Sequence, residues 1–313
     1  MYKNILVALE APMDMHRANS GQNQLGNATA IKRRPDGRVY VSGQMQRHAF
    51  FEALKQLDES DETYVSPGSA TTHHIGTDLR ADLGGFLQTD FSGLGDAARR
   101  TAPLSATPAV AKEPSQRLRD LLLQLKSDSD KQNIATVEMS QSDLMQAAYS
   151  LDCTSLTTST QYDIAALNES DEKSRGVCVG ENVVAHASPD ERLRRAQLML
   201  QATRYVNAHA SQARNMSALE PQRVCIVLDP VISRKAARYF KMSTEEQTAL
   251  RNELTNRGAT VFIGDDEDES ERTVAEAYEA AADELAADGI YQEDWPVKSY
   301  EETYEGVADL LSE

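Results

Sequence analysis

The segments VCIVL (residues 224–228) and TVFI (260–263) flank the segment STEEQTALRNELTNRG (243–258). The two short apolar runs predict strands, and the first is of the buried type. The segment between them predicts a helix from Ser243 to Arg257, which Gly258 ends. The chain therefore alternates strand, helix and strand in this region, and this alternation decides the fold class.

The same alternation extends towards both ends of the chain. The run KNILVAL (3–9) predicts a strand, since it is too short for a secretory signal. The segment SPDE (188–191) combines an N-cap serine, a proline at the first helical position and a capping-box glutamate. It predicts a helix that runs to about Ala208, and residues 271–287 predict another.

The first third of the chain adds a turn and a further helix. Residues 28–33 and 38–42 predict a hairpin that turns at PDG (35–37), after a polar loop over 13–27. Ser42 resembles a helix N-cap, and apolar residues follow it at helical spacing through Leu57.

Leucines at helical spacing also predict a helix over 116–126. Two segments without helical periodicity interrupt the pattern, at 58–114 and at 154–180. We interpret both as insertions. Strands and helices that alternate around two insertions favour an α+β fold, a sandwich of the ferredoxin or RNA-recognition-motif type, over a doubly wound parallel sheet.

The charge of the chain is divided unequally along its length. The net charge is -17, and residues 243–313 contain 21 Asp and Glu against 4 Lys and Arg. Residues 1–242 contain 28 of each kind and are neutral overall. Since charges beyond about 8 Å are largely screened at physiological salt, a distant acidic region leaves a basic groove functional. The excess of Arg (22) over Lys (10) favours bidentate phosphate contacts.

Several classes of protein are disfavoured. No run of about 18 apolar residues exists, so no membrane helix is expected. The three cysteines are widely spaced, which argues against a disulfide framework or a cysteine zinc site and predicts a cytoplasmic protein. No nucleophile elbow, phosphate-binding Gly-rich loop or HExxH motif occurs, and the pair His73-His74 has no ligand partner at metal spacing. We expect no enzymatic activity, cofactor or metal.

The segment RRTAPLSATPAVA (99–111) suits a phosphate-bearing ligand. Arg99 and Arg100 precede a segment that Pro103 and Pro108 hold extended, and three hydroxyl side chains alternate along it. Two cations beside a stiff ribbon fit a repeating phosphate backbone. A surface loop with a solvated charge pair is the alternative.

Two further groups of polar residues are candidates for phosphate contact. The cations around the 35–37 turn could either contact phosphate without reading sequence or be solvated; they are Lys32, Arg33, Arg34 and Arg38. The helix that Ser42 opens has N–H groups and a dipole that favour an anion. Its polar residues Gln44 and Arg47 lie off the apolar stripe, while His48, beside Phe51, fits packing as well as binding. Arg192, Arg194 and Arg195 are interpreted as mostly solvated or facing another subunit.

Taken in order, these pieces resemble the repeated backbone subunit of the CRISPR Cascade complex, the Cas-seven-type family in its DevR-like branch, which is typical of type I-B systems. The resemblance covers about residues 1–230. Its pieces are RANSG (17–21), GNATAIKR (26–33), VSGQMQRH (41–48), DLRADLGGFL (78–87), the 99–111 segment, residues 192–204 and ARNMSALEP (213–221).

The resemblance implies a palm with a core like an RNA-recognition motif, formed by 1–57, 115–141 and 188–313, of which 243–313 is the acidic part. It implies a finger at 58–114 and a thumb at 142–187. Copies of the subunit would form a helical filament along a CRISPR RNA, together with other Cascade subunits, and present the guide to target DNA without a membrane partner. The implied RNA contacts add Arg17, Asn19, Arg214, Asn215 and Met216 to Lys32, Arg33, Arg34, Ser42, Gln44, Arg47, His48, Arg99 and Arg100.

Two alternatives stay open. A type III-like backbone subunit would cleave bound target RNA with a divalent metal through Asp152 or Asp163, although aspartates also commonly cap turns. Alternatively, the chain is a structural protein from an acidic proteome, in which the basic clusters pair with the acidic C-terminal residues. Aromatic residues make up only 6% of the chain, which favours cradling of a backbone over stacking on bases.

Overall fold

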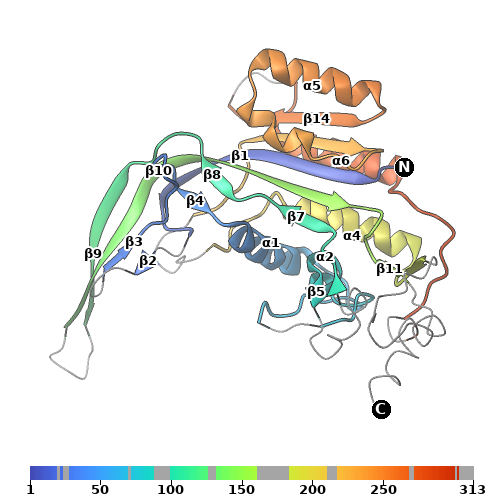
Figure 1. Cartoon of the computed structure of the whole chain (residues 1–313), viewed down its shortest axis with the longest axis horizontal. Coiled ribbons are helices and arrows are strands. Elements are labelled where there is room, and N and C mark those ends of the chain that lie inside the picture. Colours follow the sequence, from blue (N-terminus) through green and yellow to red (C-terminus); the bar gives the residue numbers. More distant parts are fainter. Residues whose placement is uncertain are drawn as a thin grey trace, which may run out of the picture.

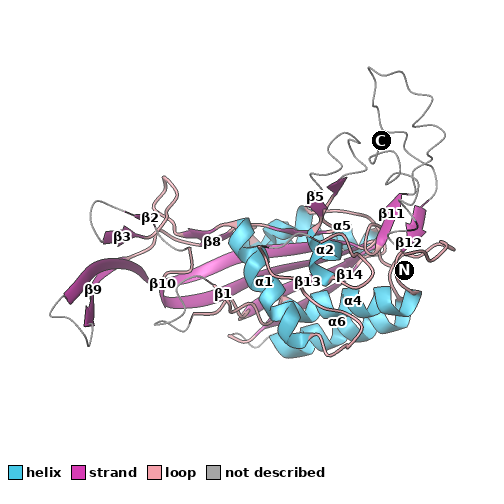
Figure 2. Cartoon of the chain, turned by 90° about the horizontal axis from the view of Figure 1, so that it is seen from below, coloured by secondary structure: helices cyan, strands magenta, loops and turns pink. Residues whose placement is uncertain are grey.

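A mostly antiparallel sheet with helices on both faces forms the body of the protein in the computed structural model (Figures 1 and 2). The structure describes residues 1–19, 22–23, 28–69, 72–87, 99–125, 132–160, 183–209, 217–267, 271–299 and 302. Its four central strands lie in the order β14 (Thr260–Asp265), β13 (Arg223–Asp229), β1 (Asn4–His16) and β10 (Gln132–Asp152). Each pair of neighbours among them is antiparallel.

The long strand β10 organises the other edge of the sheet. Three strands pair with it antiparallel: β7 (Leu104–Ala106), β8 (Ala109–Ala111) and β9 (Arg117–Leu125). The β9–β10 hairpin curves away from the body (Figure 1). At its base, β3 (Ala28–Ala30) pairs with β10 in parallel, and β2 (Gln22–Asn23) pairs with β3.

The remaining strands are short. β4 (Tyr40–Val41) pairs with β8. Two small two-stranded sheets stand apart, one formed by β5 (Phe86–Leu87) and β6 (Arg99–Arg100) and the other by β11 (Thr158–Thr160) and β12 (Val183–Ala185).

Side chains of β1 alternate between two apolar cores. Ile5, Val7 and Leu9 belong to the larger core, with the helices α1 (Gly43–Leu57), α4 (Pro189–Ala202) and α6 (Val274–Asp288). Leu6 and Ala8 belong to the smaller core on the opposite face, with the 3-10 helix η2 (Lys235–Lys241) and the helix α5 (Thr244–Asn256). Because both faces are covered, the strand reads as a continuous apolar run.

Most of the elements expected from the sequence are confirmed. The strands at 3–9, 224–228 and 260–263 lie in β1, β13 and β14, and the helix at 271–287 is α6. Ser42, Ser188 and Ser243 are N-caps, and the side chain of each accepts the N–H of the residue three positions on. Gly258 follows α5 with a φ of +84°, which fits a helix end.

The expected hairpin at 28–42 is confirmed only at its turn. The N–H of Arg34 donates to the carbonyl of Arg38 over 2.9 Å, and Arg33 and Val39 form an isolated antiparallel bridge. Beyond this bridge the two flanking segments separate, since β3 joins β10 and β4 joins β8.

Three of the sequence predictions on secondary structure are wrong. The helix that Ser188 opens ends at Ala202 and does not run to about Ala208. Residues 116–126 are not a helix, because 117–125 form β9, and Leu118 and Leu121 are exposed on this strand. Residues 117–125 pair with 132–140 along their whole length, and this pairing overrides the helical spacing of the leucines. The sequence predicted a loop from residue 13, but Met13 to His16 continue β1 beside β10, so the loop begins later than predicted.

The expected division into palm, finger and thumb stays a prediction. β10 passes without a break through residue 142, where the sequence placed the start of the thumb. Within the expected finger, β7 and β8 pair with the central sheet, whereas the helix α2 (Leu79–Gly84) and the β5–β6 pair stand outside it.

Candidate nucleic-acid interface

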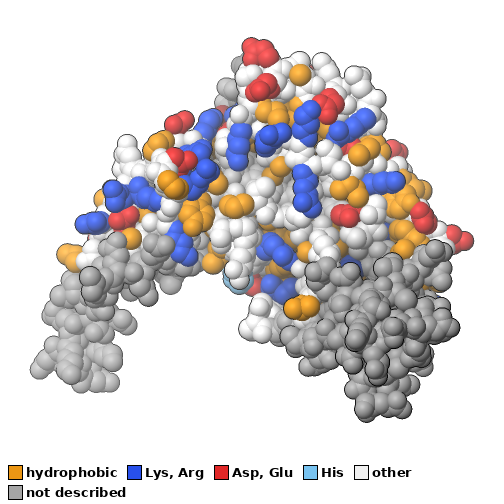
Figure 3. Space-filling model, in the orientation of Figure 1, with side chains coloured by type: hydrophobic (Ala, Val, Ile, Leu, Met, Phe, Trp, Pro, Cys, Tyr) orange, Lys and Arg blue, Asp and Glu red, His pale blue; other side chains and the backbone are white. Residues whose placement is uncertain are grey.

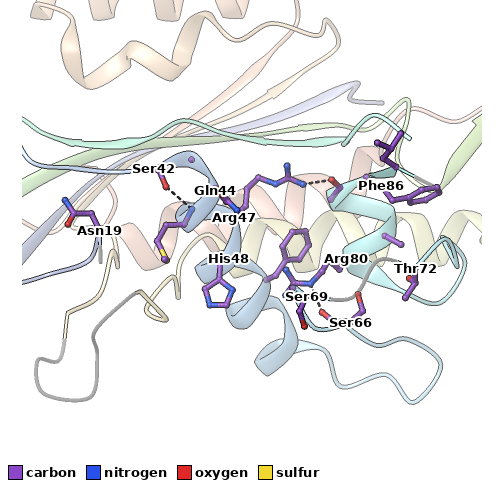
Figure 4. A pocket seen from close by; sticks show the side chains of 18 of the residues that line it. Asn19, Ser42, Gln44, Arg47, His48, Ser66, Ser69, Thr72, Arg80 and Phe86 are labelled. Carbon is purple, nitrogen blue, oxygen red and sulfur yellow. Dashed lines mark hydrogen bonds between the residues drawn. The ribbon is translucent and has the colours of Figure 1, made fainter. Parts of the chain in front are cut away.

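A cleft of about 1040 Å³ lies between the start of α1 and the segment from Ser66 to Leu87 (Figure 4). Its basic lining residues are Lys32, Arg47, His48 and Arg80. No Asp or Glu is among the described residues that line it. In a chain of net charge -17, this cleft is therefore locally basic.

The first turn of α1 forms one wall of the cleft. Gly43 and Gln44, the first two residues of the helix, line it, and Ser42 Oγ accepts the N–H of Met45 over 3.3 Å. The first N–H groups of an α-helix have no partner within the helix, and the helix dipole adds positive potential at this end. The wall therefore offers backbone donors to a phosphate oxygen.

Arg47 joins α1 to the opposite wall. Its guanidinium donates to the carbonyl of Gly84, the last residue of α2. A Cβ at Gly84 would lie 3.1 Å from Phe51 Cζ and 3.2 Å from Arg47 Nη2. Glycine at this position therefore makes room for the guanidinium. Burial lowers the pKa of Arg47, but an arginine stays charged in proteins.

Arg80 is the second cation that packing holds at the cleft. Its Nε donates to the carbonyl of Ser66 over 2.5 Å, and its guanidinium lies 4.5 Å from the centre of the Phe51 ring. Glu52 Oε1 lies 3.5 Å from Arg80 Nη2. Sequence reasoning did not select Arg80 as a contact, although it lies in the quoted 78–87 segment; only the fold brings residue 80 beside residues 47 and 51.

Six of the residues predicted to contact RNA line this single cleft: Asn19, Lys32, Ser42, Gln44, Arg47 and His48. The amide of Asn19 donates to the carbonyls of Lys32 and Tyr40, over 2.8 and 3.0 Å. This pair of bonds fixes the end of the cleft nearest the sheet. Gln44 and His48 are exposed on α1, so their polar groups are accessible to a ligand.

Three other predicted contacts lie outside this lining, namely Arg17, Arg33 and Arg34. Arg33 donates to the carbonyl of Ser115 over 3.0 Å and lies 3.8 Å from Glu138. Arg34 lies 3.6 Å from Asp36, at the turn. Arg214, Asn215 and Met216 fall outside the described residues, as does the side chain of Arg99.

Arg100 is placed inside the protein. Its side chain is 8% exposed and donates to Asp82 Oδ1 over 2.6 Å, and to the carbonyls of Ser155 and Thr158. These contacts tie β6 to α2 and to the turn before β11. A phosphate would have to displace Asp82 to reach this guanidinium, so the geometry gives Arg100 a structural role.

Arg195 meets the same carboxylate from α4. Its Nη1 donates to Asp82 Oδ2 over 2.9 Å and its Nε to Glu191 over 2.7 Å, and its side chain is fully buried. Arg192 is also buried and donates to the carbonyls of Cys153 and Leu156. The expectation that these two arginines are solvated is wrong, because α4 packs against the segments that supply these acceptors.

Asp82 thus stands between two guanidinium groups, and we call Asp82, Arg100 and Arg195 the Asp82 cluster. Burial alone raises the pKa of Asp82, but Arg100 and Arg195 outweigh it and hold the pKa below the usual value. The N–H and hydroxyl of Thr157 also donate to this carboxylate.

The residues considered for catalysis have other roles or lie outside the description. Asp152 Oδ1 accepts the N–H and the hydroxyl of Thr154, over 2.9 and 2.6 Å, and so caps a turn. Asp163 is outside the described residues. Within the described part of the chain, no group of three His, Cys, Asp or Glu side chains is arranged to hold a metal, and no helix is long and apolar enough to span a membrane.

Comparison with known proteins identifies relatives in fold. No protein-family model and no curated protein sequence matches the chain. One similar structure is a chain of a CRISPR RNA-guided surveillance complex, with a TM-score of 0.50 and 11% identity over 90% of this chain and 99% of that chain. Another belongs to such a complex before nicking, with a TM-score of 0.53 and 9% identity over 91% and 100%. At these identities the likeness shows a shared fold of mixed helix and antiparallel sheet.

Proposed function

We propose that this chain is a non-catalytic backbone subunit of a type I Cascade effector complex, which binds CRISPR RNA and presents it for pairing with target DNA. The observation that carries the proposal is the likeness of fold to chains of CRISPR RNA-guided surveillance complexes, over 90% of this chain and 99% of the other. The DevR-like, type I-B assignment and assembly of copies along the guide belong to this proposal and come from the sequence resemblance.

The strand order supports a palm of the RNA-recognition-motif type. β13, β1, β10 and β7 are neighbours in this order, and α1 and α4 pack on one face. Proteins with this motif commonly stack RNA bases on aromatic residues of the opposite face. Here η2 and α5 cover that face, with Tyr239 and Phe240 buried between them and the sheet. RNA bound by this chain therefore needs another surface.

The cleft supplies that surface. Its donors are the first turn of α1, Gln44, Lys32 and the two arginines held by Gly84 and Ser66. Such contacts bind phosphates and leave bases unread. A guide carrier needs this arrangement, because the guide's own bases must stay free to pair with target.

Gln44→Glu tests the cleft without weakening the helix. A carboxylate at the second position of α1 interacts favourably with the helix dipole, by about 0.3–1 kcal/mol, but repels phosphate. We expect the purified variant to carry less nuclease-sensitive RNA than the natural chain, sized on a denaturing gel after mild purification. We also expect it to bind a single-stranded RNA more weakly in fluorescence anisotropy.

Ala275→Glu is the matched control, since Ala275 occupies the second position of α6. This substitution adds the same charge at the same helix position, but α6 does not contribute to the cleft lining. The proposal predicts a normal RNA content for this variant. Equal RNA loss in both variants would show a general effect of charge, and an RNA-free natural chain would contradict the proposed function.

A further inference from the structure

The 3-10 helix η2 displays a straight row of cations. A 3-10 helix has three residues per turn, so Lys235, Arg238 and Lys241 lie above one another, with a step of about 6 Å. All three are exposed, while Ala236, Tyr239 and Phe240 are buried against the sheet and α5. We call Lys235, Arg238 and Lys241 the η2 row.

The carboxylates beside the row already have partners. The row lines a hollow of about 400 Å³ together with Glu246 and Glu253 on α5. Glu246 accepts the N–H of Ser243 over 2.8 Å, and Glu253 pairs with Lys235 and Arg257. In the described part of the chain, Arg238 and Lys241 form no ion pair.

Two further cations act on the end of the row. Partial burial of the Lys241 ammonium lowers its pKa, and the charges of Arg38 and Arg34 lower it further. Asp36 is the shared ion-pair partner of these two arginines, and its carboxylate, with a smaller contribution from Glu113, raises the pKa of Arg38. The space-filling view shows Lys and Arg side chains gathered over the upper part of the visible face, with some Asp and Glu among them (Figure 3).

We infer that the η2 row is a second binding surface for the phosphate backbone of a single-stranded nucleic acid. It would bind the strand without recognising its base sequence. A row of cations at regular steps matches a strand whose phosphates recur regularly. The row lies on the sheet face opposite α1, whose first turn forms a wall of the cleft. This inference does not depend on the guide assignment.

The composition of the row favours nucleic acid over a protein partner. Protein interfaces are depleted in lysine and centre on aromatic or apolar side chains. Here lysine supplies two of the three row positions, and the aromatic residues of η2 point inward. Phosphate contacts are made chiefly by Lys and Arg.

The double variant Arg238→Gln/Lys241→Gln tests the inference in the full chain. Each phosphate contact contributes about 0.7 to the slope of log affinity against log salt for a single strand. Fluorescence anisotropy of a mixed-sequence single-stranded oligonucleotide, titrated over a salt series, should therefore give a slope about 1.4 shallower. Neither residue carries an ion pair in the described structure, so we expect the fold to hold, checked by circular dichroism.

Lys55→Gln/Arg272→Gln removes two exposed cations outside the row and serves as the charge-matched control. An equal slope change in the control, or an unchanged slope in the row variant, would overturn the inference. Loss of self-association in the row variant without a slope change would assign the surface to a second copy of the chain, and would also overturn it.

A combined variant with Gln44→Glu separates this inference from the proposed function. Two independent surfaces predict that each variant weakens binding at its own surface only, and that the combined variant shows both losses unchanged in size. If Gln44→Glu alone changes nothing while the row variant flattens the slope, the cleft assignment fails and the η2 row stands. The opposite result would leave the cleft and remove the row.

Discussion

Two groups of arginines in this protein differ in what surrounds them. In the Asp82 cluster, Arg100 and Arg195 share one buried carboxylate and are almost fully enclosed. At the cleft, Arg47 and Arg80 donate to backbone carbonyls. Arg80 also lies 3.5 Å from Glu52, and Arg47 has no carboxylate partner among the described residues.

The comparison shows that a guanidinium can bind a ligand only where its charge is not already neutralised. Arg100 and Arg47 were both predicted to contact RNA. The carboxylate of Asp82 compensates Arg100 in a dry site, whereas Arg47 keeps its charge beside a solvent-filled cleft. We therefore expect the first group to control stability and the second to control binding.

Asp82→Asn has the largest expected effect. Removing one partner of a buried ion pair costs about 3–5 kcal/mol, because it leaves the other charge uncompensated. Urea unfolding should show a loss of this order. Asp36→Asn, at an exposed ion pair, should change stability by at most about 1 kcal/mol. Equal losses of unfolding free energy in the two variants would contradict the structural role of the Asp82 cluster.

The Asp82 cluster also predicts acid sensitivity. Since the pKa of Asp82 is lower in the folded than in the unfolded chain, its stabilising contribution is present above the unfolded value, about 3.9. It is lost as pH falls through the folded value. Asp82→Asn should therefore flatten the decline of unfolding free energy below about pH 4, measured against the natural chain.

Gly84→Leu has the next largest effect and acts on the cleft. The added side chain would crowd Phe51 and Arg47, at a cost of about 1–3 kcal/mol for overpacking, and would fill the space between α1 and α2. We expect single-stranded RNA binding to be lost while the folded state persists, as followed by anisotropy and circular dichroism. Unchanged binding would contradict the cleft assignment.

Lys32→Gln has the smallest expected effect and separates the two groups. It should leave the unfolding free energy within about 0.5 kcal/mol and make the salt slope of RNA binding about 0.7 shallower. Arg100→Gln should do the opposite, with lost stability and an unchanged slope. A flatter slope for Arg100→Gln would restore the original prediction for this residue.

Local signals in the sequence predicted much of the fold and part of the site. Ser42, Ser188 and Ser243 mark helix starts through bonds within one turn, so neighbouring residues suffice to identify them. Gln44, Arg47 and His48 share the first turns of one helix, so their grouping at the cleft also followed from the sequence.

Other features depend on residues far apart in the chain. Residues 117–125 have helical spacing, but pairing with 132–140 makes them a strand. Arg80 reaches the cleft only because α2 packs beside α1, and nothing near residue 195 announces that Asp82 will meet it. Such contacts lie outside any local window of sequence.

The sequence by itself determined three of the four central strands, the caps of the main helices and the unequal distribution of charge, because each depends on residue type and short-range spacing. Only the tertiary structure decided which arginines are neutralised inside and which face a ligand. The physical reason is that the charge available to a ligand depends on burial and on the nearest opposite charge, and packing between distant segments sets both.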